Sequence, residues 1–293
     1  MRAQSYPHWE WILAVSDGAM HDQPEAVTRL TRESRVRLIA LAPEESRATA
    51  WNAAFRAARG TFAALLDPGD DLSPNALYEI ASAMQRAPGC DLFYTDEDCR
   101  QRETNNRADP RFKPDWSPEL LLSCNYIGRL AFLRVETALA RGGFRVGYEG
   151  AEEWDLFLRL SRTNARIRRV PVCVYHRGPR ADAPGRKEAE AAALLDHCAD
   201  RGLEAAAVSR ASAGYRITWH IKERPMVSIV IPNRNAADVI VPCVRGLLHE
   251  TSYPRREVVI VDNGSTDVEV FKLYDSLRRD GRGIVIPFEE PFN

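Results

Sequence analysis

The sequence lacks several features that would point to a particular class of protein. Its 293 residues carry a formal net charge of -1, so no excess of positive charge favours nucleic acid as a partner. No apolar run approaches the roughly 20 residues that span a bilayer, and the first residues do not resemble the core of a signal peptide. No G-x-G-x-x-G motif follows a candidate strand, which argues against a dinucleotide-dependent oxidoreductase.

Cysteine and histidine are few and scattered along the chain. The six cysteines include no C-x-x-C pair, and the six histidines are equally dispersed, so the sequence indicates no zinc site built from protein side chains alone. Scattered free thiols fit a reducing compartment. We therefore expect a cytoplasmic protein, and the sequence leaves open whether it also contacts the inner face of a membrane.

What the chain does contain is a regular alternation of short apolar runs and helical patterns. Its composition is ordinary for a folded protein, with 45% hydrophobic and 28% charged residues. The alternation predicts an α/β fold, with a mostly parallel sheet and helices on both of its faces. Strands are expected at residues 11–15, 36–41, 62–66 and 91–95, and helices at residues 24–32, 48–59 and 74–86.

The stretch Thr61–Pro74 combines an apolar run with an acidic turn. The run ends in three carboxylates, Asp67, Asp70 and Asp71, just before a predicted helix. The carboxyl ends of strands are where open α/β sheets bind ligands, and carboxylate oxygens suit a divalent cation. The alternative is that Asp67 and Asp70 only form the turn, as aspartate often does beside proline and glycine.

Part of the pattern is repeated. A Ser-Tyr-Pro sequence, a strand and a polar turn occupy residues 5–19, and the same order returns at residues 252–265. In the second copy a further strand and helix, residues 227–250, precede this block. We therefore expect three parts: residues 1–178, an α/β domain without its first strand and most of its first helix; residues 179–224, a linker with a helix and a short strand; and residues 225–293, the first part of a second domain.

A domain without its first strand would expose backbone groups that need partners. Three arrangements would resolve this: upstream sequence supplies the strand, residues 227–232 fold back into the vacant position, or the first domain is only partly ordered. We expect the fold-back, because an exposed edge is costly and the matching strand is tethered nearby.

Eight stretches of the chain follow one another in the order of a known family. Together they resemble tandem family 2 glycosyltransferases, inverting enzymes of GT-A fold, with this chain truncated at both ends. The resemblance implies a Rossmann-like, mostly parallel sheet in a partial tandem repeat. The stretches are Leu65–Pro74, Tyr94–Asp98, Phe112–Pro118, Asn125–Gly128, Gly150–Asp155, Tyr175–Arg177, Val227–Asn235 and Tyr253–Asp267.

The resemblance implies a function as well as a fold. It implies transfer of a sugar, of the hexosyltransferase type, from a nucleotide-diphospho-sugar to a glycan or lipid-linked glycan acceptor in surface polysaccharide assembly. A divalent cation, Mn²⁺ or Mg²⁺, is implied as the cofactor. The alternative is a degenerate or truncated, non-catalytic GT-A module that binds nucleotide or glycan, or that scaffolds a partner.

The resemblance assigns metal binding to three residues. Asp67 and Asp70 stand at the family's Asp-x-Asp motif, and His176 could be a further contact to the metal or the diphosphate. Gly69 occupies the position of the motif's second aspartate, which is a departure from the pattern. A lone histidine at a strand end is otherwise an ordinary hydrogen-bonding side chain.

Glu153 stands where the family usually has its catalytic aspartate, and Asp155 lies two residues further on. A carboxylate here would remove the proton from the acceptor hydroxyl, which requires a reach of roughly 2.6–3.2 Å. The alternative is that both are only acids in the first turn of a helix, where the helix dipole favours negative charge.

The remaining candidates concern the nucleotide and the acceptor. Asp17 may otherwise form only an Asx turn, and Trp116 may be only a packing anchor. Trp51 and the pair Glu44–Glu45 replace residues that are usual in the family. The candidates are Asp17, Asn52, Asp262 and Asn263 for the nucleotide, and Trp116 and Asp96 for the acceptor or sugar.

Overall fold

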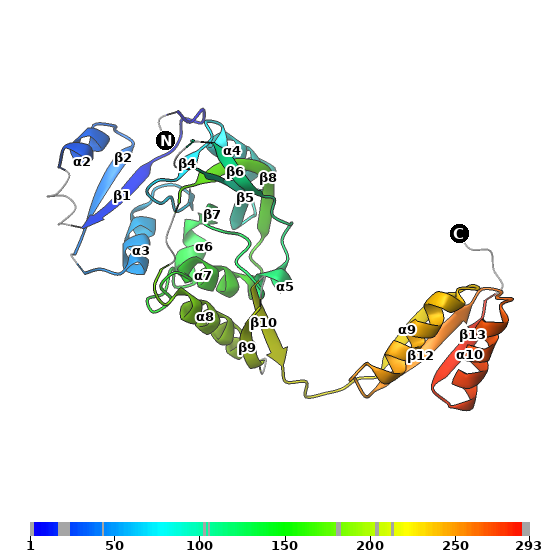
Figure 1. Ribbon diagram of the computed structural model, residues 1–293. Helices are drawn as coiled ribbons and strands as arrows, with labels where there is room; N and C mark the ends of the chain where they lie inside the picture. Colours follow the sequence, from blue (N-terminus) through cyan, green and yellow to red (C-terminus); the bar gives the residue numbers. More distant parts are fainter. Residues whose placement is uncertain are drawn as a thin grey trace. The chain divides into compact units, whose positions relative to one another are not determined.

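The computed structural model describes residues 3–16, 24–42, 44–101, 104, 106–179, 183–202, 205–211 and 214–288. The chain divides into two compact units, Met1–His220 and Ile221–Asn293, each of which is described by itself (Figure 1).

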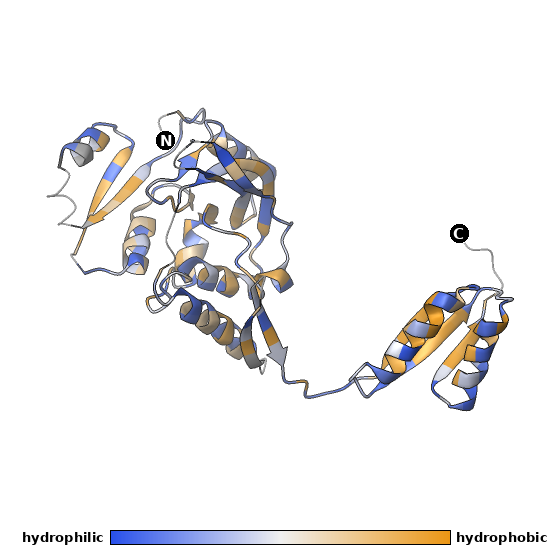
Figure 2. Cartoon of the chain, in the orientation of Figure 1, coloured by the Kyte–Doolittle hydropathy of each residue, from blue (hydrophilic) through white to orange (hydrophobic). Residues whose placement is uncertain are grey.

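The first unit begins with a two-stranded parallel sheet. Strand β1 pairs in parallel with β2, and both strands are predominantly apolar (Figure 2). Helix α3 begins after Ser46, whose side chain accepts a hydrogen bond from the backbone N–H of Thr49, as an N-cap does. These elements agree with the predicted order. They are β1 (Trp11–Ser16), α2 (Pro24–Thr31), β2 (Val36–Leu41) and α3 (Arg47–Ala57).

A six-stranded mixed sheet forms the centre of the first unit. Its order is β3-β7-β5-β8-β4, with β6 paired to β5. Only β5 and β8 pair in parallel in this sheet, within the described residues, because the other neighbours join in antiparallel ladders. The strands are β3 (Phe62–Ala63), β4 (Asp71–Leu72), β5 (Leu92–Arg100), β6 (Arg107–Arg111), β7 (Ala131–Arg134) and β8 (Ile167–Arg177).

Two of these strands differ from the predicted ones. The run expected at 62–66 is a strand only in β3, after which the chain turns toward Asp67. Strand β5 continues through Asp96, Glu97 and Asp98, which the sequence placed after its end, and all three are buried. Each of the three meets a cationic group or a histidine, so that burial does not leave the charges unpaired.

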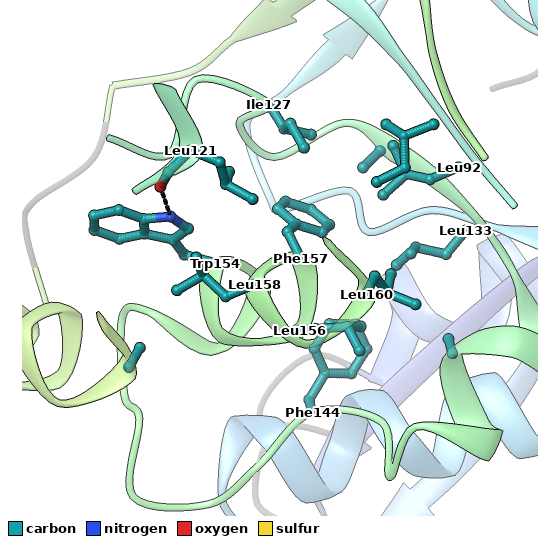
Figure 3. Close-up of a cluster of buried hydrophobic side chains, with 14 of the residues drawn as sticks. Leu92, Leu121, Ile127, Leu133, Phe144, Trp154, Leu156, Phe157, Leu158 and Leu160 are labelled. Atoms are coloured by element: carbon teal, nitrogen blue, oxygen red, sulfur yellow. Dashed lines mark hydrogen bonds between the residues drawn. The ribbon is translucent and has the colours of Figure 1, made fainter. Parts of the chain in front are cut away.

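Alternating side chains of the central sheet build a hydrophobic cluster on each face. Leu92 and Tyr94 of β5 belong to one cluster, and Phe93 between them belongs to the other. Helix α7 packs on the first face, where it contributes five buried apolar residues, and α4 packs on the second (Figure 3). The helices are α4 (Ala76–Arg86), α5 (Pro118–Leu121), α6 (Val135–Ala140) and α7 (Glu152–Ser161).

The segment predicted as a linker, residues 179–224, is largely packed against the first unit. Leu194 of α8 is fully buried in the same cluster as α7. The Tyr215 ring lies 5.6 Å from the Trp154 ring, and its hydroxyl donates a hydrogen bond of 2.9 Å to Glu190 Oε2. The elements are α8 (Arg186–Asp200), β9 (Ala205–Ala211) and β10 (Gly214–Trp219).

The second unit is a three-stranded parallel sheet with two helices. Strand β12 lies between β11 and β13, and its buried Val258 and Ile260 pack against α9 and α10. Because β11 pairs with β12, the structure does not show the expected fold-back of residues 227–232. The elements are β11 (Val227–Asn233), α9 (Ala237–His249), β12 (Arg256–Asp262), α10 (Val268–Arg279) and β13 (Gly283–Pro287).

Among the described residues, no helix combines the length and the apolar character that crossing a membrane requires.

The burial of α8 predicts that it stabilises the first unit. Leu194→Ala should lower the free energy of unfolding by about 2–5 kcal/mol, because it removes a fully buried side chain. Leu195→Ala is the matched control: this neighbour is 45% exposed, so its loss should cost about 0.5 kcal/mol or less. Urea unfolding of both variants measures the difference, and equal effects would show that α8 is not part of the folded unit.

Candidate functional site

Arg129 joins the two carboxylates that the sequence assigned to opposite tasks. Its Nε lies 3.2 Å from Asp67 Oδ2, and its Nη1 donates a hydrogen bond of 2.6 Å to Glu153 Oε2. Asp67 follows β3, Glu153 lies in the first turn of α7, and Arg129 lies in the loop before β7. Three segments that are distant in sequence therefore meet at one guanidinium.

Glu153 has the electrostatics of a tuned acid-base group. It is only 7% exposed, and burial raises its pKa to about 7. The charge of Arg129 works in the opposite direction, while Asp67 and Glu152 add to the increase in pKa. Within the part of the chain that the structure describes, no group donates a hydrogen bond to Glu153 Oε1.

The position of Glu153 is fixed by the helix that carries it. Helix α7 follows Gly150, whose φ of 89° lies in the left-handed region that favours glycine. Trp154, the next residue after Glu153, is buried and donates a hydrogen bond of 2.9 Å to the carbonyl of Leu121 (Figure 3). Because one side of α7 is locked into the core, Glu153 is held on a rigid element.

Trp51 supports Arg129 from below. The guanidinium carbon of Arg129 lies 5.1 Å from the centre of the Trp51 ring, and that of Arg47 lies 4.9 Å from it. Arg47 also pairs with Glu152, at 3.2 Å between Nε and Oε1. Trp51, which departs from the family pattern in sequence, thus has a defined place beside the cluster.

The loop that carries Arg129 is braced by a buried ion pair. Lys113 donates a hydrogen bond of 2.6 Å from Nζ to the carbonyl of Ile127, and its Nζ lies 2.9 Å from Glu97 Oε2. Burial lowers the pKa of Lys113, and the neighbouring Glu97 opposes that change. Gly128 has a φ of 74°, and a Cβ there would lie 2.7 Å from Glu97 Oε2. Glycine is therefore required next to Arg129.

Asp70 makes its contacts within the protein. Its Oδ2 accepts hydrogen bonds from the hydroxyl of Tyr175 at 2.6 Å and from the N–H of Asp67 at 3.2 Å, and its Oδ1 accepts one from the N–H of Gly178 at 3.0 Å. Gly69, at the position of the missing aspartate, has a φ of 90°, which disfavours other residues.

His176 uses both of its ring nitrogens. Nδ1 lies 2.6 Å from Asp98 Oδ1, and Nε2 lies 2.8 Å from Ser73 Oγ. Burial would raise the pKa of Asp98, but the hydrogen bonds from His176 and Arg107 outweigh it and lower the pKa. The order of groups is that of a catalytic triad, yet Pro74 after Ser73 has no N–H for an oxyanion. These contacts tie the ends of three strands together.

No group of three or more histidine, cysteine, aspartate or glutamate side chains is gathered in a metal-binding arrangement among the residues placed in the structure. Asp67 and Asp70 nevertheless supply hard oxygen atoms on one turn. Mg²⁺ is commonly held by one or two carboxylates together with phosphate oxygens of a substrate. The donor set present here therefore fits a cation that is shared with a diphosphate, rather than a cation held by protein side chains alone.

Asp155, the second candidate for the base, lies in a different environment from Glu153. Arg145 donates to its carboxylate from Nε at 3.0 Å and also from Nη2, and Arg159 donates from Nη2 at 2.8 Å. Asp155 is 1% exposed. Two guanidinium groups therefore surround it, and it ties α7 to the preceding loop.

Asn52 and Asp96 are also committed to protein partners. The Asn52 amide donates 2.7 Å to the carbonyl of Phe144 and accepts 2.9 Å from its N–H. Asp96 receives two hydrogen bonds from Arg169, at 3.0 and 2.7 Å, and one from the N–H of Lys113. Trp116 is half-buried and packs against the core. Neither of the polar pairs includes Arg129.

The nucleotide candidates outside this cluster fall in two places. Asp17 lies outside the described residues. Asp262 ends β12 and accepts hydrogen bonds from the hydroxyls of Tyr274, at 2.8 Å, and of Ser265. The N–H of Asn263 donates 2.9 Å to the carbonyl of Asn233 at the end of β11. These two residues thus lie at the carboxyl edge of the second sheet, where α/β folds bind ligands.

The sequence did not identify Arg129 or Lys113 as parts of a site. The family-like stretch Asn125–Gly128 ends one residue before Arg129, and a single arginine after a glycine carries no signal of its own. Lys113 lies inside the stretch Phe112–Pro118, but its burial depends on the packing of β5 beside the loop.

Known proteins resemble this chain over most of its length. It is 36% identical over 301 residues to the O-antigen biosynthesis protein RfbC of Myxococcus xanthus, covering 99% of this chain and 23% of that protein. It is 32% identical to the uncharacterized protein y4gI of Sinorhizobium fredii, covering 100% of this chain and 34% of that protein. The chain thus spans about a quarter to a third of these curated relatives.

A solved structure and a family model agree with the fold. S. aureus TarS, residues 1–349, superposes with a TM-score of 0.53 at 14% identity, over 67% of this chain and 58% of that one. This likeness shows the GT-A fold. The model of glycosyl transferase family 2 matches residues 1–138 and 228–292, so the repeat seen in the sequence corresponds to two separate matches. The chain belongs to glycosyl transferase family 2.

Proposed function

We propose that this chain is an inverting glycosyltransferase. It moves a sugar, of the hexose type, from a nucleotide-diphospho-sugar to a glycan or lipid-linked glycan in surface polysaccharide assembly. The observation that carries the proposal is the buried Glu153 beside Arg129 and Asp67. It combines a candidate base and a candidate site for the diphosphate within reach of one side chain.

Glu153 is suited to the work of a general base. A base works best when its pKa lies near the pH of the reaction, and burial brings the pKa of Glu153 to about 7. Its Oε2 is held by Arg129, which leaves Oε1 to accept the proton of the acceptor hydroxyl. The acceptor oxygen then bonds to the sugar carbon as the bond to the nucleotide diphosphate breaks.

Negative charge that grows on the leaving diphosphate needs compensation. Asp67, with Asp70 beside it, would hold a divalent cation, Mn²⁺ or Mg²⁺, which supplies positive charge to the diphosphate. The guanidinium of Arg129 lies at the same place and matches the geometry of phosphate oxygens.

The biological setting rests on a relative. RfbC is an O-antigen biosynthesis protein by its name, and this chain is 36% identical to a quarter of it. We extend the same role, synthesis of a surface polysaccharide on the cytoplasmic side of the membrane, to this chain. Peripheral contact with that membrane would bring a lipid-linked acceptor to the site.

A second candidate function is nucleotide or glycan binding without turnover, including a scaffolding role. The contacts of Asp70 with Tyr175 and Gly178, and the glycine at position 69, favour it, because they leave fewer oxygen atoms for a cation. Binding of a nucleotide diphosphate without consumption of any nucleotide sugar would distinguish it from the transferase.

A panel of nucleotide sugars with Mn²⁺, scored for release of free nucleotide diphosphate, tests the transferase directly. We expect release from one donor class by the wild-type chain and its loss in Asp67→Asn, because the carboxylate that serves the cation is removed. Glu149→Gln, an exposed acid in the loop before α7, is the control and should keep release unchanged. Release that persists in Asp67→Asn would contradict the assignment of this carboxylate.

The rate of transfer should depend on the charge of Glu153. The base is active when it has lost its proton, so kcat should rise with pH through about 7 and level off above it. Glu153→Gln should lower kcat by about 10²–10⁴-fold and abolish this rise. Glu152→Gln changes the neighbouring buried acid and should keep the rise. A wild-type rate that is already flat between pH 5 and about 8 would contradict the role of Glu153.

A further inference from the structure

We propose that Arg129 is an internal counterion that keeps a divalent cation away from Asp67 until a diphosphate is present. In the free protein its guanidinium pairs with Asp67 and Glu153 together. A diphosphate would then draw Arg129 away from Asp67, so that the cation and the diphosphate bind in a coupled way. This inference rests on the proposed function, because it concerns the same carboxylates.

The first step is that Arg129 already occupies the place of a cation. Its Nε is 3.2 Å from Asp67 Oδ2, and the two side chains are only 13% and 18% exposed. Water therefore screens the pair poorly, and a second positive charge at Asp67 would meet strong repulsion. A divalent cation alone must either displace the guanidinium or bind beside it.

The second step is that Arg129 is held in this position from two other sides. Glu153 accepts its Nη1 hydrogen bond at 2.6 Å, and the Trp51 ring lies 5.1 Å from its guanidinium carbon. Lys113 and Gly128 fix the backbone of its loop. The guanidinium cannot simply turn into solvent without losing several contacts, so it remains a competitor for any cation.

The third step is that a diphosphate can release the competitor. A guanidinium has five N–H donors, and the contacts with Asp67 and Glu153 use only part of them. Its planar geometry matches phosphate oxygens, and pairing with phosphate compensates for the loss of Asp67. Asp67 is then available to the cation, which the same diphosphate also ligates. Each ligand should therefore increase the affinity of the other.

Binding of Mn²⁺ alone, followed by electron paramagnetic resonance of the free ion, tests this inference without any sugar transfer. Arg129→Gln should bind Mn²⁺ about tenfold or more tightly than the wild type in the absence of nucleotide, within the usual range of such couplings. Arg47→Gln is the matched control: it removes a guanidinium over the same Trp51 ring that does not contact Asp67. It should change Mn²⁺ affinity by about threefold or less, as expected from general charge alone.

Two additions make the result decisive. The double variant Arg129→Gln with Asp67→Asn should lose the gain in Mn²⁺ affinity, which assigns the gain to Asp67. Adding UDP, GDP, CDP or dTDP should increase Mn²⁺ affinity in the wild type and much less in Arg129→Gln. If Arg129→Gln does not fold by circular dichroism, Arg129→Met, which keeps an apolar stem over Trp51, replaces it.

The outcomes separate this inference from the proposed function. Equal Mn²⁺ affinities of Arg129→Gln and Arg47→Gln would overturn the counterion role, even if the wild type transfers sugar. A gain that is specific to Arg129→Gln and depends on Asp67 would support the role, even if no nucleotide sugar is turned over.

Discussion

The structure of the first unit depends on keeping one carboxylate out of water without leaving its charge uncompensated. An isolated buried carboxylate is so costly that it takes up a proton instead. Glu153 is balanced between these states: burial raises its pKa, while Arg129 at 2.6 Å stabilises its charged form. A group in this balance can exchange a proton near neutral pH, which an exposed glutamate with its pKa near 4.3 does poorly.

The surrounding fold serves to hold that balance in place. Trp154 and the apolar side of α7 fix the helix, and Lys113 with Glu97 fixes the loop of Arg129. A displacement of about 1 Å in either element would change the distance between the charges and with it the pKa. The two buried ion pairs are thus linked: the pair of Lys113 shapes the loop, and the pair of Arg129 sets the electrostatics of the site.

The sequence predicted the elements and two of the site's members better than it predicted their partners. Asp67 and Glu153 were recognisable because each stands at a fixed place in an ordered set of stretches. Arg129 was not, because its role depends on a loop that returns to a strand end far away in sequence. Asp155 carries the same chemical signal as Glu153, and only the packing of Arg145 and Arg159 around it separates the two environments.

The packing of α8 was missed for a related reason. Its alanine-rich sequence and its polar flanks are typical of a linker helix, and the contacts that bury Leu194 come from α7 and Tyr215. Local sequence determines that a helix forms there, whereas the surface it covers is decided by other parts of the chain.

The titration of Glu153 tests the central claim most directly. Selective ¹³C labelling of glutamate, with assignment of the Glu153 Cδ resonance by comparison with Glu153→Gln, allows its chemical shift to be followed between pH 4 and about 9. The burial and charges around Glu153 predict a midpoint near 7. They also predict a higher midpoint in Arg129→Gln, because the cation that favours the charged form is removed. A midpoint near the ordinary value of 4.5, unchanged by that substitution, would contradict the description of Glu153 as a buried base held by Arg129.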